Sequence, residues 1–451
     1  MSDTFHALAT PPGTAALAVI RVCGPMVPGI VEAVFGTPPS PADARRARLG
    51  AYRSRDGARV DQVLHSWFPA GASFTGRDTL EISCHGNPFL VDRILADLDA
   101  RGSRPAEPGE FTRTAFLEGK IDLSQAEAVA DLIAARGEAA VEAAHRQLAG
   151  GLGTEIEGVV SEILAILAQV EAYIDFPEED LPPEDAEGPL ASLAGTIARL
   201  DAMIATGRQR ELLHRGIRTV IAGEVNAGKS SLLNRLLGEE RVIVSDTAGT
   251  TRDTVGETFA LGKFCIQIFD TAGFREAADA VEREGLRHAE RASETADFHL
   301  LVVDGTRPSP ALPPGLPGRL DPSNALVVRN KMDAPGFDPP ADFAPGLPRV
   351  SVSAKTGEGF PEFLARWESL LEGELLAGAE SRVLYNQRHI GFLRRCRAAL
   401  ERARGTLREG ASPEYAAPDL REALDALGAI VGTVDNEAML DVLFGEFCIG
   451  K

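Results

Sequence analysis

A long stretch of the chain that begins at Leu123 has helical spacing of its apolar residues. The stretch is rich in alanine, and the apolar positions within Ile156–Ile174 follow one another three and four residues apart, as on one face of an amphipathic helix. We predict that this helix ends at Pro177. An acidic, proline-rich loop, Glu178–Glu187, separates it from a second helix, which places four apolar residues on one face: Leu193, Ile197, Leu200 and Ile204.

The first 118 residues have a different pattern. Short apolar strand segments alternate with turns there, as in Ala16–Val22 before Gly24-Pro25, and Thr79–Ser83 before His85-Gly86-Asn87-Pro88. This alternation predicts a compact α+β domain at the start of the chain.

Apolar runs typical of buried strands occupy the middle of the chain, and helical spacing resumes at Val383. The simplest architecture is therefore a multidomain α/β protein in which an α/β domain interrupts a helical domain. The predicted segments are an N-terminal domain, the first helical part, the inserted domain and the second helical part, at residues 1–118, 119–212, 213–375 and 376–451.

The first strand run of the inserted domain leads into Gly223-Glu224-Val225-Asn226-Ala227-Gly228-Lys229-Ser230, and a helical stretch, Ser231–Leu237, follows. Two glycines that flank four residues, followed by Lys-Ser between a strand and a helix, direct backbone N–H groups and a helix N-terminus at phosphates. We expect Lys229 to contact the β- and γ-phosphate oxygens and the Ser230 hydroxyl to bind Mg²⁺.

Asp270-Thr271-Ala272-Gly273 follows the next strand run, Phe264–Phe269. A carboxylate at this strand end can hold the Mg²⁺ shell, and the Gly273 N–H can reach the γ-phosphate.

Asn330-Lys331-Met332-Asp333 follows a third strand run, Ala325–Val328, and Ser353-Ala354-Lys355 follows a fourth. Asp333 can accept the N1 and N2 protons of guanine while the Lys331 stem covers the ring, whereas adenine has the opposite polarity at this edge. The last motif supplies a backbone contact to the guanine O6. The ordered motifs predict an inserted Ras-like P-loop GTPase domain.

The predicted GTP-binding residues are those of the four motifs and of a threonine-rich segment between the first two: Asn226, Ala227, Gly228, Lys229, Ser230, Ser231, Ser245, Asp246, Thr247, Ala248, Gly249, Thr250, Thr251, Asp270, Thr271, Ala272, Gly273, Asn330, Lys331, Asp333, Ser353, Ala354 and Lys355. Within the threonine-rich segment, we expect Thr251 to be the second protein ligand of Mg²⁺.

Two positions depart from common small GTPases. Phe274 stands where a glutamine usually orients the attacking water. Glu282 is a candidate that could act through a second water, although its charge run is also typical of a solvated helix face. The Asn226 amide oxygen, with carbonyls of the segment that begins at Ser245, could hold a monovalent cation where an arginine finger would otherwise place its charge.

Composition limits the other possibilities. The net charge of −20 argues against a large nonspecific nucleic-acid surface, which needs clustered Lys and Arg. The five cysteines lack Cys-x-x-Cys spacing and cannot all pair, which favours a reducing compartment. Met1–Thr10 has no signal-peptide pattern, and no run approaches the ~18 apolar residues of a membrane span. We therefore expect a soluble cytoplasmic protein.

Short segments along the whole chain resemble the MnmE (TrmE) family of tRNA-modification GTPases. Besides the GTPase motifs with Asn226, the segments that carry the resemblance are Ala9-Thr10-Pro11-Pro12-Gly13, Val19-Ile20-Arg21, Leu80-Glu81-Ile82-Ser83-Cys84-His85-Gly86, Gly109-Glu110-Phe111-Thr112-Arg113, Gly119-Lys120-Ile121-Asp122-Leu123, Ile174-Asp175-Phe176-Pro177, Asn386-Gln387-Arg388-His389 and Cys448-Ile449-Gly450-Lys451.

The resemblance implies a potassium-stimulated GTPase that is a homodimer joined through its N-terminal, folate-binding domains. It also implies an FAD- and NADH-using partner of the MnmG (GidA) type, in a heterotetramer. The joint product would be an aminomethyl or carboxymethylaminomethyl group at C5 of the wobble uridine (position 34) of certain tRNAs. The one-carbon donor would be a tetrahydrofolate derivative, in the 5,10-methylene or 5-formyl form.

The resemblance also assigns site residues. Folate would contact Arg21, Glu81, Lys120 and Lys451; K⁺ would bind Asn226, Ser245, Thr247 and Thr250; Mg²⁺ would bind Ser230 and Thr251. Glu282 would orient the water, and Cys448 would be catalytic near the folate. From chemistry alone, a cysteine between Phe447 and Ile449 is also typical of a small buried apolar residue, and Arg21 and Lys120 could be surface charges.

The GTPase motifs by themselves also fit a second class of function, a GTP-dependent regulatory or ribosome-assembly switch without modification chemistry. The folate-type N-terminal domain and Cys448 favour the modification enzyme over the switch.

Overall fold

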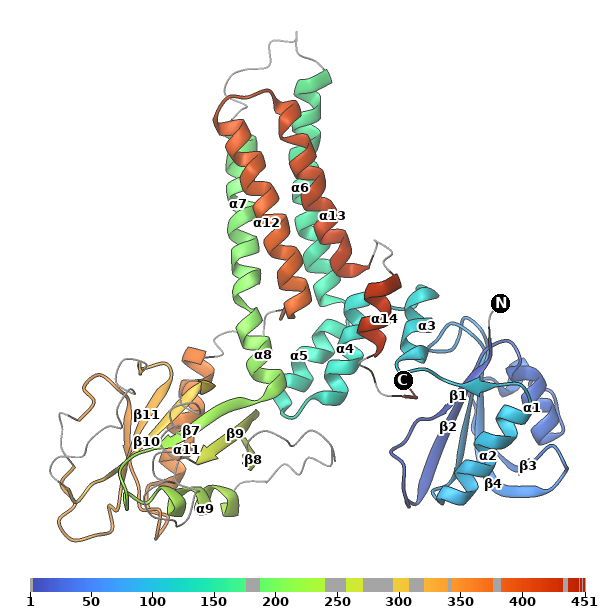
Figure 1. Cartoon of the computed structure of the whole chain (residues 1–451), viewed down its shortest axis with the longest axis horizontal. Helices are drawn as coiled ribbons and strands as arrows, with labels where there is room; N and C mark the ends of the chain where they lie inside the picture. Colours follow the sequence, from blue (N-terminus) through green and yellow to red (C-terminus); the bar gives the residue numbers. More distant parts are fainter. Residues whose placement is uncertain are drawn as a thin grey trace, which may run out of the picture. The chain divides into compact units, whose positions relative to one another are not determined.

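The structure is a computed structural model of the chain (Figure 1), and it describes residues 3–175, 187–239, 257–270, 295–307, 320–339, 343–375, 383–432, 437–445, 447 and 449–450. Its contacts form two compact units: Met1–Ala130 with Gly428–Lys451, and Asp131–Leu427. The limits of the four segments given above stay predictions.

The first unit is built on a six-stranded sheet with the order β3-β4-β5-β2-β1-β6. Neighbouring strands are antiparallel except for β1 and β6. The strands are β1 Phe5–Leu8, β2 Leu17–Cys23, β3 Arg48–Arg53, β4 Arg59–Phe68, β5 Thr79–His85 and β6 Arg104–Pro105. The strands predicted around Ala16–Val22 and Thr79–Ser83 are thus confirmed.

One face of this sheet is covered by helices α1 (Val27–Phe35) and α2 (Pro88–Ala100), which share a buried core with Ile20 and Ile82. Because side chains alternate along a strand, the intervening residues lie on the opposite face. That face is covered near β1 by Phe111 of α3 (Glu110–Leu117). In the same unit, α14 (Glu437–Gly445) packs against α3 and the start of α4 (Leu123–Ala134).

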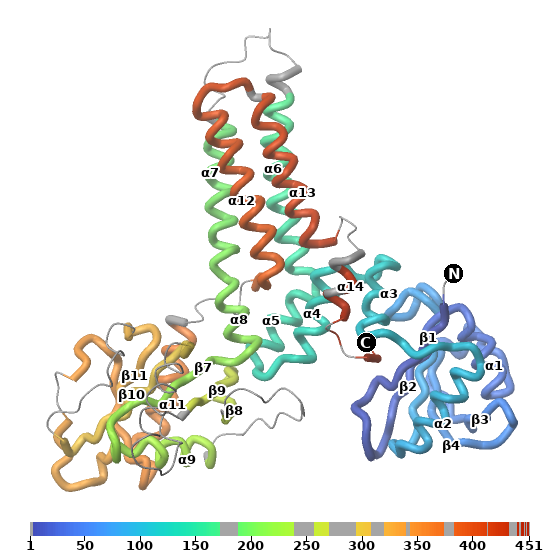
Figure 2. The backbone as a smooth tube through the Cα atoms, viewed as in Figure 1, coloured from blue at the N-terminus to red at the C-terminus, as the bar shows by residue number. Residues whose placement is uncertain are grey.

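A helical bundle forms one part of the second unit. Its long helices lie side by side (Figure 2) and are α6 Gly151–Asp175, α7 Glu187–Ala205, α12 Gln387–Arg408 and α13 Ala417–Val431. Helix α12 contacts α7, and Arg421 of α13 pairs with Glu171 of α6 at 2.9 Å. The structure describes α6 as far as Asp175, and the helix end predicted at Pro177 lies outside the described residues. The bundle is discontinuous in sequence, because a whole sheet domain lies between α7 and α12.

The inserted domain has a six-stranded sheet with the order β12-β11-β10-β7-β9-β8. Among the strands that the structure describes in this domain, only β8 runs antiparallel to its neighbour. The strands are β7 Ile217–Ala222, β8 Glu257–Leu261, β9 Phe264–Asp270, β10 Phe298–Asp304, β11 Ala325–Asn330 and β12 Arg349–Ser351. Helices α9 (Lys229–Glu239) and α11 (Phe360–Leu370) share a core with one face of this sheet, in which Trp367 is fully buried. The predicted multidomain α/β fold with an inserted Ras-like P-loop domain is confirmed.

A single glycine, Gly216, joins this sheet to the helix before it, α8 (Gly207–Arg215). Gly216 has φ +89°, a conformation that favours glycine. The Asp297 carboxylate bridges the joint, because Oδ1 pairs with Arg215 Nη2 at 2.9 Å and Oδ2 accepts the backbone N–H of Arg218 at 2.9 Å. Leu212 of α8 and Ala139 of α5 (Glu138–Leu148) lie in the same core as the sheet. Helix and strand are therefore tied together on both sides of the joint.

Four cysteines lie among the residues that the structure describes, and all four are buried free thiols: Cys23, Cys84, Cys265 and Cys396. Within the same described ranges, no helix is both long enough and apolar enough to span a membrane.

Candidate nucleotide-binding site

The glycine-rich loop connects the carboxyl end of β7 to the first turn of α9. Gly223 and Gly228 have φ of +151° and +96°. A Cβ at Gly223 would lie 2.0 Å from the Val302 carbonyl oxygen, and one at Gly228 would lie 2.0 Å from Asn330 Nδ2. The Val302 backbone at Gly223 and the buried Asn330 side chain at Gly228 leave no room for a Cβ, which explains both glycines of the motif.

Lys229 opens helix α9, and its side chain arches back over this loop. Its Nζ donates hydrogen bonds to the carbonyl oxygens of Gly223 and Glu224, at 2.9 and 2.8 Å. The residue is 8% exposed. An ammonium group held beside a helix N-terminus and a glycine-rich loop is an arrangement that binds phosphate oxygens.

Asn330, the last residue of β11, joins two of the predicted motifs. Its Nδ2 donates to the Ala227 carbonyl oxygen at 2.9 Å, and its Oδ1 accepts the Ala354 N–H at 3.0 Å. The side chain is buried, so both hydrogen bonds are made away from water. This one amide holds the glycine-rich loop and the loop after β12 against each other.

Asp333 and Ser353 meet at the same edge of the sheet. Ser353 Oγ donates to Asp333 Oδ1 at 2.7 Å and accepts the Thr356 N–H at 3.0 Å. The Ser353 hydrogen bond lowers the pKa of Asp333 below its ordinary value, so this exposed carboxylate is ionised near neutral pH and only accepts hydrogen bonds.

The loop with Ser353 is anchored from below by helix α9. The Arg235 guanidinium donates to the carbonyl oxygens of Ala354, at 2.8 Å, and Lys355, at 2.9 Å. The structure thus brings together the described members of the motif set, which are Asn226, Ala227, Gly228, Lys229, Ser230, Ser231, Asn330, Lys331, Asp333, Ser353, Ala354 and Lys355.

The sequence analysis missed two partners of this set, Arg235 and Asp304. Lys331 Nζ donates to Asp304 Oδ2 at 2.6 Å. Asp304 is the last residue of β10 and lies opposite Asn330 in the parallel pairing of β10 with β11. Its position at the end of a mostly apolar, fully buried strand is the same signal that located the other motifs.

Some predicted site residues lie outside the described residues. They are Ser245, Asp246, Thr247, Ala248, Gly249, Thr250, Thr251, Thr271, Ala272, Gly273, Glu282, Cys448 and Lys451, together with the side chain of Asp270.

In the first unit, Arg21 of β2 and Glu81 of β5 are directly opposite each other, and Arg21 Nε pairs with Glu81 Oε1 at 2.8 Å. Arg21 Nη1 also lies 3.5 Å from the Gly450 carbonyl oxygen. Gly450 itself is buried, and a Cβ there would lie 2.5 Å from the Leu8 carbonyl oxygen. The last described residue of the chain therefore packs beside this ion pair. Lys120 Nζ donates instead to the Gly71 carbonyl oxygen at 2.7 Å.

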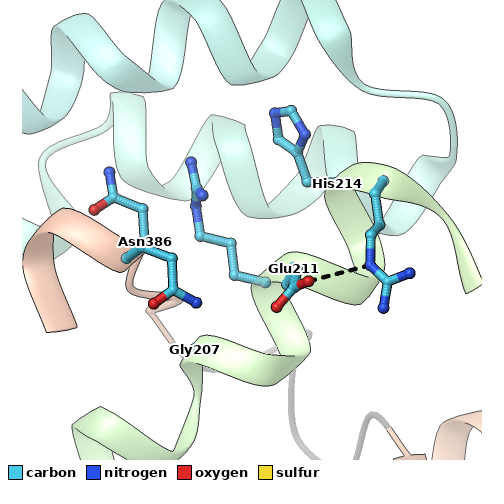
Figure 3. Close-up of a pocket in the computed structure, with 7 residues that line it drawn as sticks. Gly207, Glu211, His214 and Asn386 are labelled. Carbon is cyan, nitrogen blue, oxygen red and sulfur yellow. Dashed lines mark ion pairs between the residues drawn. The ribbon is translucent and has the colours of Figure 1, made fainter. Parts of the chain in front are cut away.

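A separate polar pocket of about 130 Å³ lies between α8 and the start of α12 (Figure 3). Its charged groups are compensated: Glu211 pairs with Arg215, while Arg210 and His214 pair with Asp131. No residue from the predicted site lists lines it; its lining residues are Gly207, Arg210, Glu211, His214, Arg215, Asn386 and Gln387.

The Asn386-to-His389 segment beside this pocket has a structural role. The Asn386 side chain accepts the His389 N–H, and His389 Nδ1 accepts the Asn386 N–H, so the two residues form a reciprocal cap of α12.

Comparison with known proteins agrees with these features. Residues 123–448 match the MnmE helical domain family, and residues 4–120 match the family described as the GTP-binding protein TrmE N-terminus. The tRNA modification GTPase MnmE of Opitutus terrae is 46% identical, over 100% of this chain and 99% of that protein. The protein of the same name from Akkermansia muciniphila is 44% identical, over 99% of each chain. The chain therefore belongs to the MnmE family of tRNA modification GTPases.

Proposed function

We propose that this chain is a potassium-stimulated GTPase that works with a flavin-dependent partner of the MnmG type. Together they add an aminomethyl or carboxymethylaminomethyl group to C5 of the wobble uridine of certain tRNAs, with a tetrahydrofolate derivative as one-carbon donor. Its family membership identifies it as a GTP hydrolase in tRNA modification. One observation supports GTP binding above all: three motif loops meet at one edge of the sheet and are joined by the Asn330 side chain.

Each nucleotide group has a proposed partner in this arrangement. Backbone N–H groups of the glycine-rich loop and the Lys229 ammonium bind the phosphates. Mg²⁺ is held by Ser230 and Thr251, with Asp270 in its outer shell. Asp333 accepts the N1 and N2 protons of guanine, and the low pKa of its carboxyl group supports this acceptor role. The hydrogen-bonded loop with Ala354 offers its backbone to the guanine O6.

The proposed K⁺ site uses the amide oxygen of Asn226 together with Ser245, Thr247 and Thr250. Asn226 has φ +66°, a left-handed conformation that asparagine adopts more readily than most residues. K⁺ would stabilise charge that develops during hydrolysis, the role that an arginine finger has in other GTPases. Glu282 would orient the attacking water through a second water.

GTP hydrolysis is expected to be roughly tenfold or more faster in KCl than in NaCl, since a correctly placed cation acts mainly in the transition state. Asn226→Gly should remove the difference, because glycine keeps the left-handed backbone and loses only the ligand oxygen. The measurement is the rate of phosphate release in each salt, with GDP affinity measured alongside.

Val225→Gly is the matched control for loop flexibility, because Val225 is the exposed neighbour of Asn226 in the same loop. It should keep the preference for K⁺. Equal rates of the unsubstituted protein in KCl and NaCl would contradict the potassium site.

The proposed folate site lies around Arg21 and Glu81. A pterin presents an amino-pyrimidinone edge that the Glu81 carboxylate can bind, and the glutamate tail of folate calls for cations such as Lys120 and Lys451. The approach of Gly450 to Arg21 supports a folate site that includes the segment around Gly450.

The same sheet face supports the proposed homodimer. Leu49 and Leu64 are paired across β3 and β4 and are 67% and 47% exposed, and exposed apolar side chains of this kind suit a contact with a second copy of the chain.

The chain should bind 5-formyltetrahydrofolate, and Glu81→Gln should weaken this binding roughly tenfold or more, because the charged acceptor is lost. Titration calorimetry would measure the affinity. Asp43→Asn is the control, since it removes a carboxylate from another ion pair of the same unit, the pair with Arg48. Undetectable folate binding by the unsubstituted protein would contradict the folate site.

A further inference from the structure

Four charged side chains from three segments of the chain form a continuous chain of ion pairs at the edge of the inserted sheet. Lys331 Nζ lies 2.6 Å from Asp304 Oδ2, and Arg307 Nε lies 3.7 Å from the same oxygen. Arg307 Nη1 then lies 3.2 Å from Glu224 Oε2 in the glycine-rich loop. Lys331 and Glu224 belong to the predicted motifs, whereas Asp304 and Arg307 belong to none.

The Asp304 carboxylate is held firmly in place. Its side chain is 6% exposed, Oδ1 accepts the N–H of Thr306 at 3.0 Å and its hydroxyl at 2.6 Å, and Oδ2 accepts from Lys331. Burial opposes ionisation, but the hydrogen bonds from Lys331 and Thr306 outweigh it and lower the pKa of Asp304 to about 2. The group is a carboxylate with its orientation set independently of Lys331.

Lys331 is therefore restrained at both ends. Its backbone has φ +70°, and its ammonium group is bound to a fixed acceptor. A lysine stem that has already lost rotamer freedom loses less entropy when a flat ring stacks on it. A restrained Lys331 stem favours nucleotide binding through its contact with the face of the base. It does not contact the edge of the base, which Asp333 would bind.

We propose that Asp304 is a positioning residue for guanine-nucleotide binding: it holds the Lys331 stem ready for the ring, and Arg307 extends the restraint to Glu224 on the phosphate-binding loop. This inference rests on the proposed nucleotide site and deepens it. The side chain that contacts the base would then be connected, through these ion pairs, to the loop that binds the phosphates.

The first test is Asp304→Asn, which has nearly the same shape and removes the charge. Binding of GDP and of inosine diphosphate should weaken by the same factor, roughly tenfold, because a charged hydrogen bond to Lys331 is lost while the base edge is untouched. The loss should fall on the KM for GTP rather than on kcat. Fluorescence titration at a temperature well below unfolding would measure both affinities.

The outcomes separate the proposals. An unchanged GDP affinity with a lowered melting temperature would make Asp304 a purely structural residue. A larger loss for GDP than for inosine diphosphate would mean that Asp304 acts through the base edge, and either result overturns the inference. Failure of the unsubstituted protein to bind GDP would instead overturn the proposed function.

Arg307→Met tests the extension to Glu224 and carries little risk of unfolding, because the Arg307 side chain is 50% exposed. It should weaken GDP binding about two- to threefold at low salt and lose this effect near ~1 M salt, as expected for an exposed pair. Glu224→Gln added to Arg307→Met should cause no further loss. Arg366→Met, an exposed arginine of α11, is the control; if it matched Arg307→Met, the extension would be wrong.

Discussion

Asp333→Asn is expected to weaken GDP binding by roughly a hundredfold or more, because the charged acceptor of the guanine N1 and N2 protons is lost. The asparagine amide would turn an N–H donor towards the 2-amino group of guanine. Xanthine has a carbonyl oxygen there, so the same variant should gain affinity for xanthosine diphosphate. Competition between the two diphosphates for the variant measures both changes.

Asp338→Asn is the matched control for this reversal of preference. Asp338 is an exposed acid of the same segment, and its backbone N–H, not its side chain, is bonded to the Gly305 carbonyl oxygen. It should leave the preference for GDP unchanged. If Asp333→Asn bound GDP as tightly as the unsubstituted protein, Asp333 would not be the residue that reads guanine.

Cys448→Ser is expected to abolish wobble-uridine modification while GTP hydrolysis stays close to normal. Cys448 lies outside the nucleotide-binding segment, and serine is nearly the same size. A serine hydroxyl is barely ionised at neutral pH, whereas a few per cent of a cysteine is thiolate, so serine is a poor substitute in nucleophilic or acid–base chemistry. The measurement is mass spectrometry of wobble uridines from a complemented deletion strain, with GTPase rate and melting temperature measured in parallel.

Cys396→Ser provides the contrast. Cys396 is fully buried in α12, and burial raises the pKa of its thiol to about 12, so it is not a thiolate at neutral pH. This variant should lose stability and keep modification in proportion to the folded protein that remains. Normal modification by Cys448→Ser would exclude an essential thiol at that position.

The meeting of the described motif loops at one sheet edge could be predicted from the sequence, because the motifs are local and each follows an apolar strand. Once the strands are parallel, their carboxyl ends meet at one edge, and residues as distant as Ala227, Asn330 and Ala354 must come together. Asp304 could have been found by the same reasoning, since it ends the apolar strand next to the one that Asn330 ends.

Other contacts leave no local pattern in the sequence. The Arg307–Glu224 pair depends on how two loops approach each other, and one charged residue in each loop is too common to be noticed. The packing of Gly450 beside Arg21 joins opposite ends of the chain. In the sequence, the Asn386-to-His389 segment stood out only as a family resemblance. The structure shows that it caps the start of helix α12.

Gly216 is the only residue between helix α8 and strand β7, and Asp297 bonds to Arg215 before it and to Arg218 after it. A rotation at this glycine would have to break a charged pair and a backbone hydrogen bond at the same time. These two contacts tie helix and strand together, so a displacement of the glycine-rich loop at the end of β7 would be passed on to α8 rather than absorbed at Gly216.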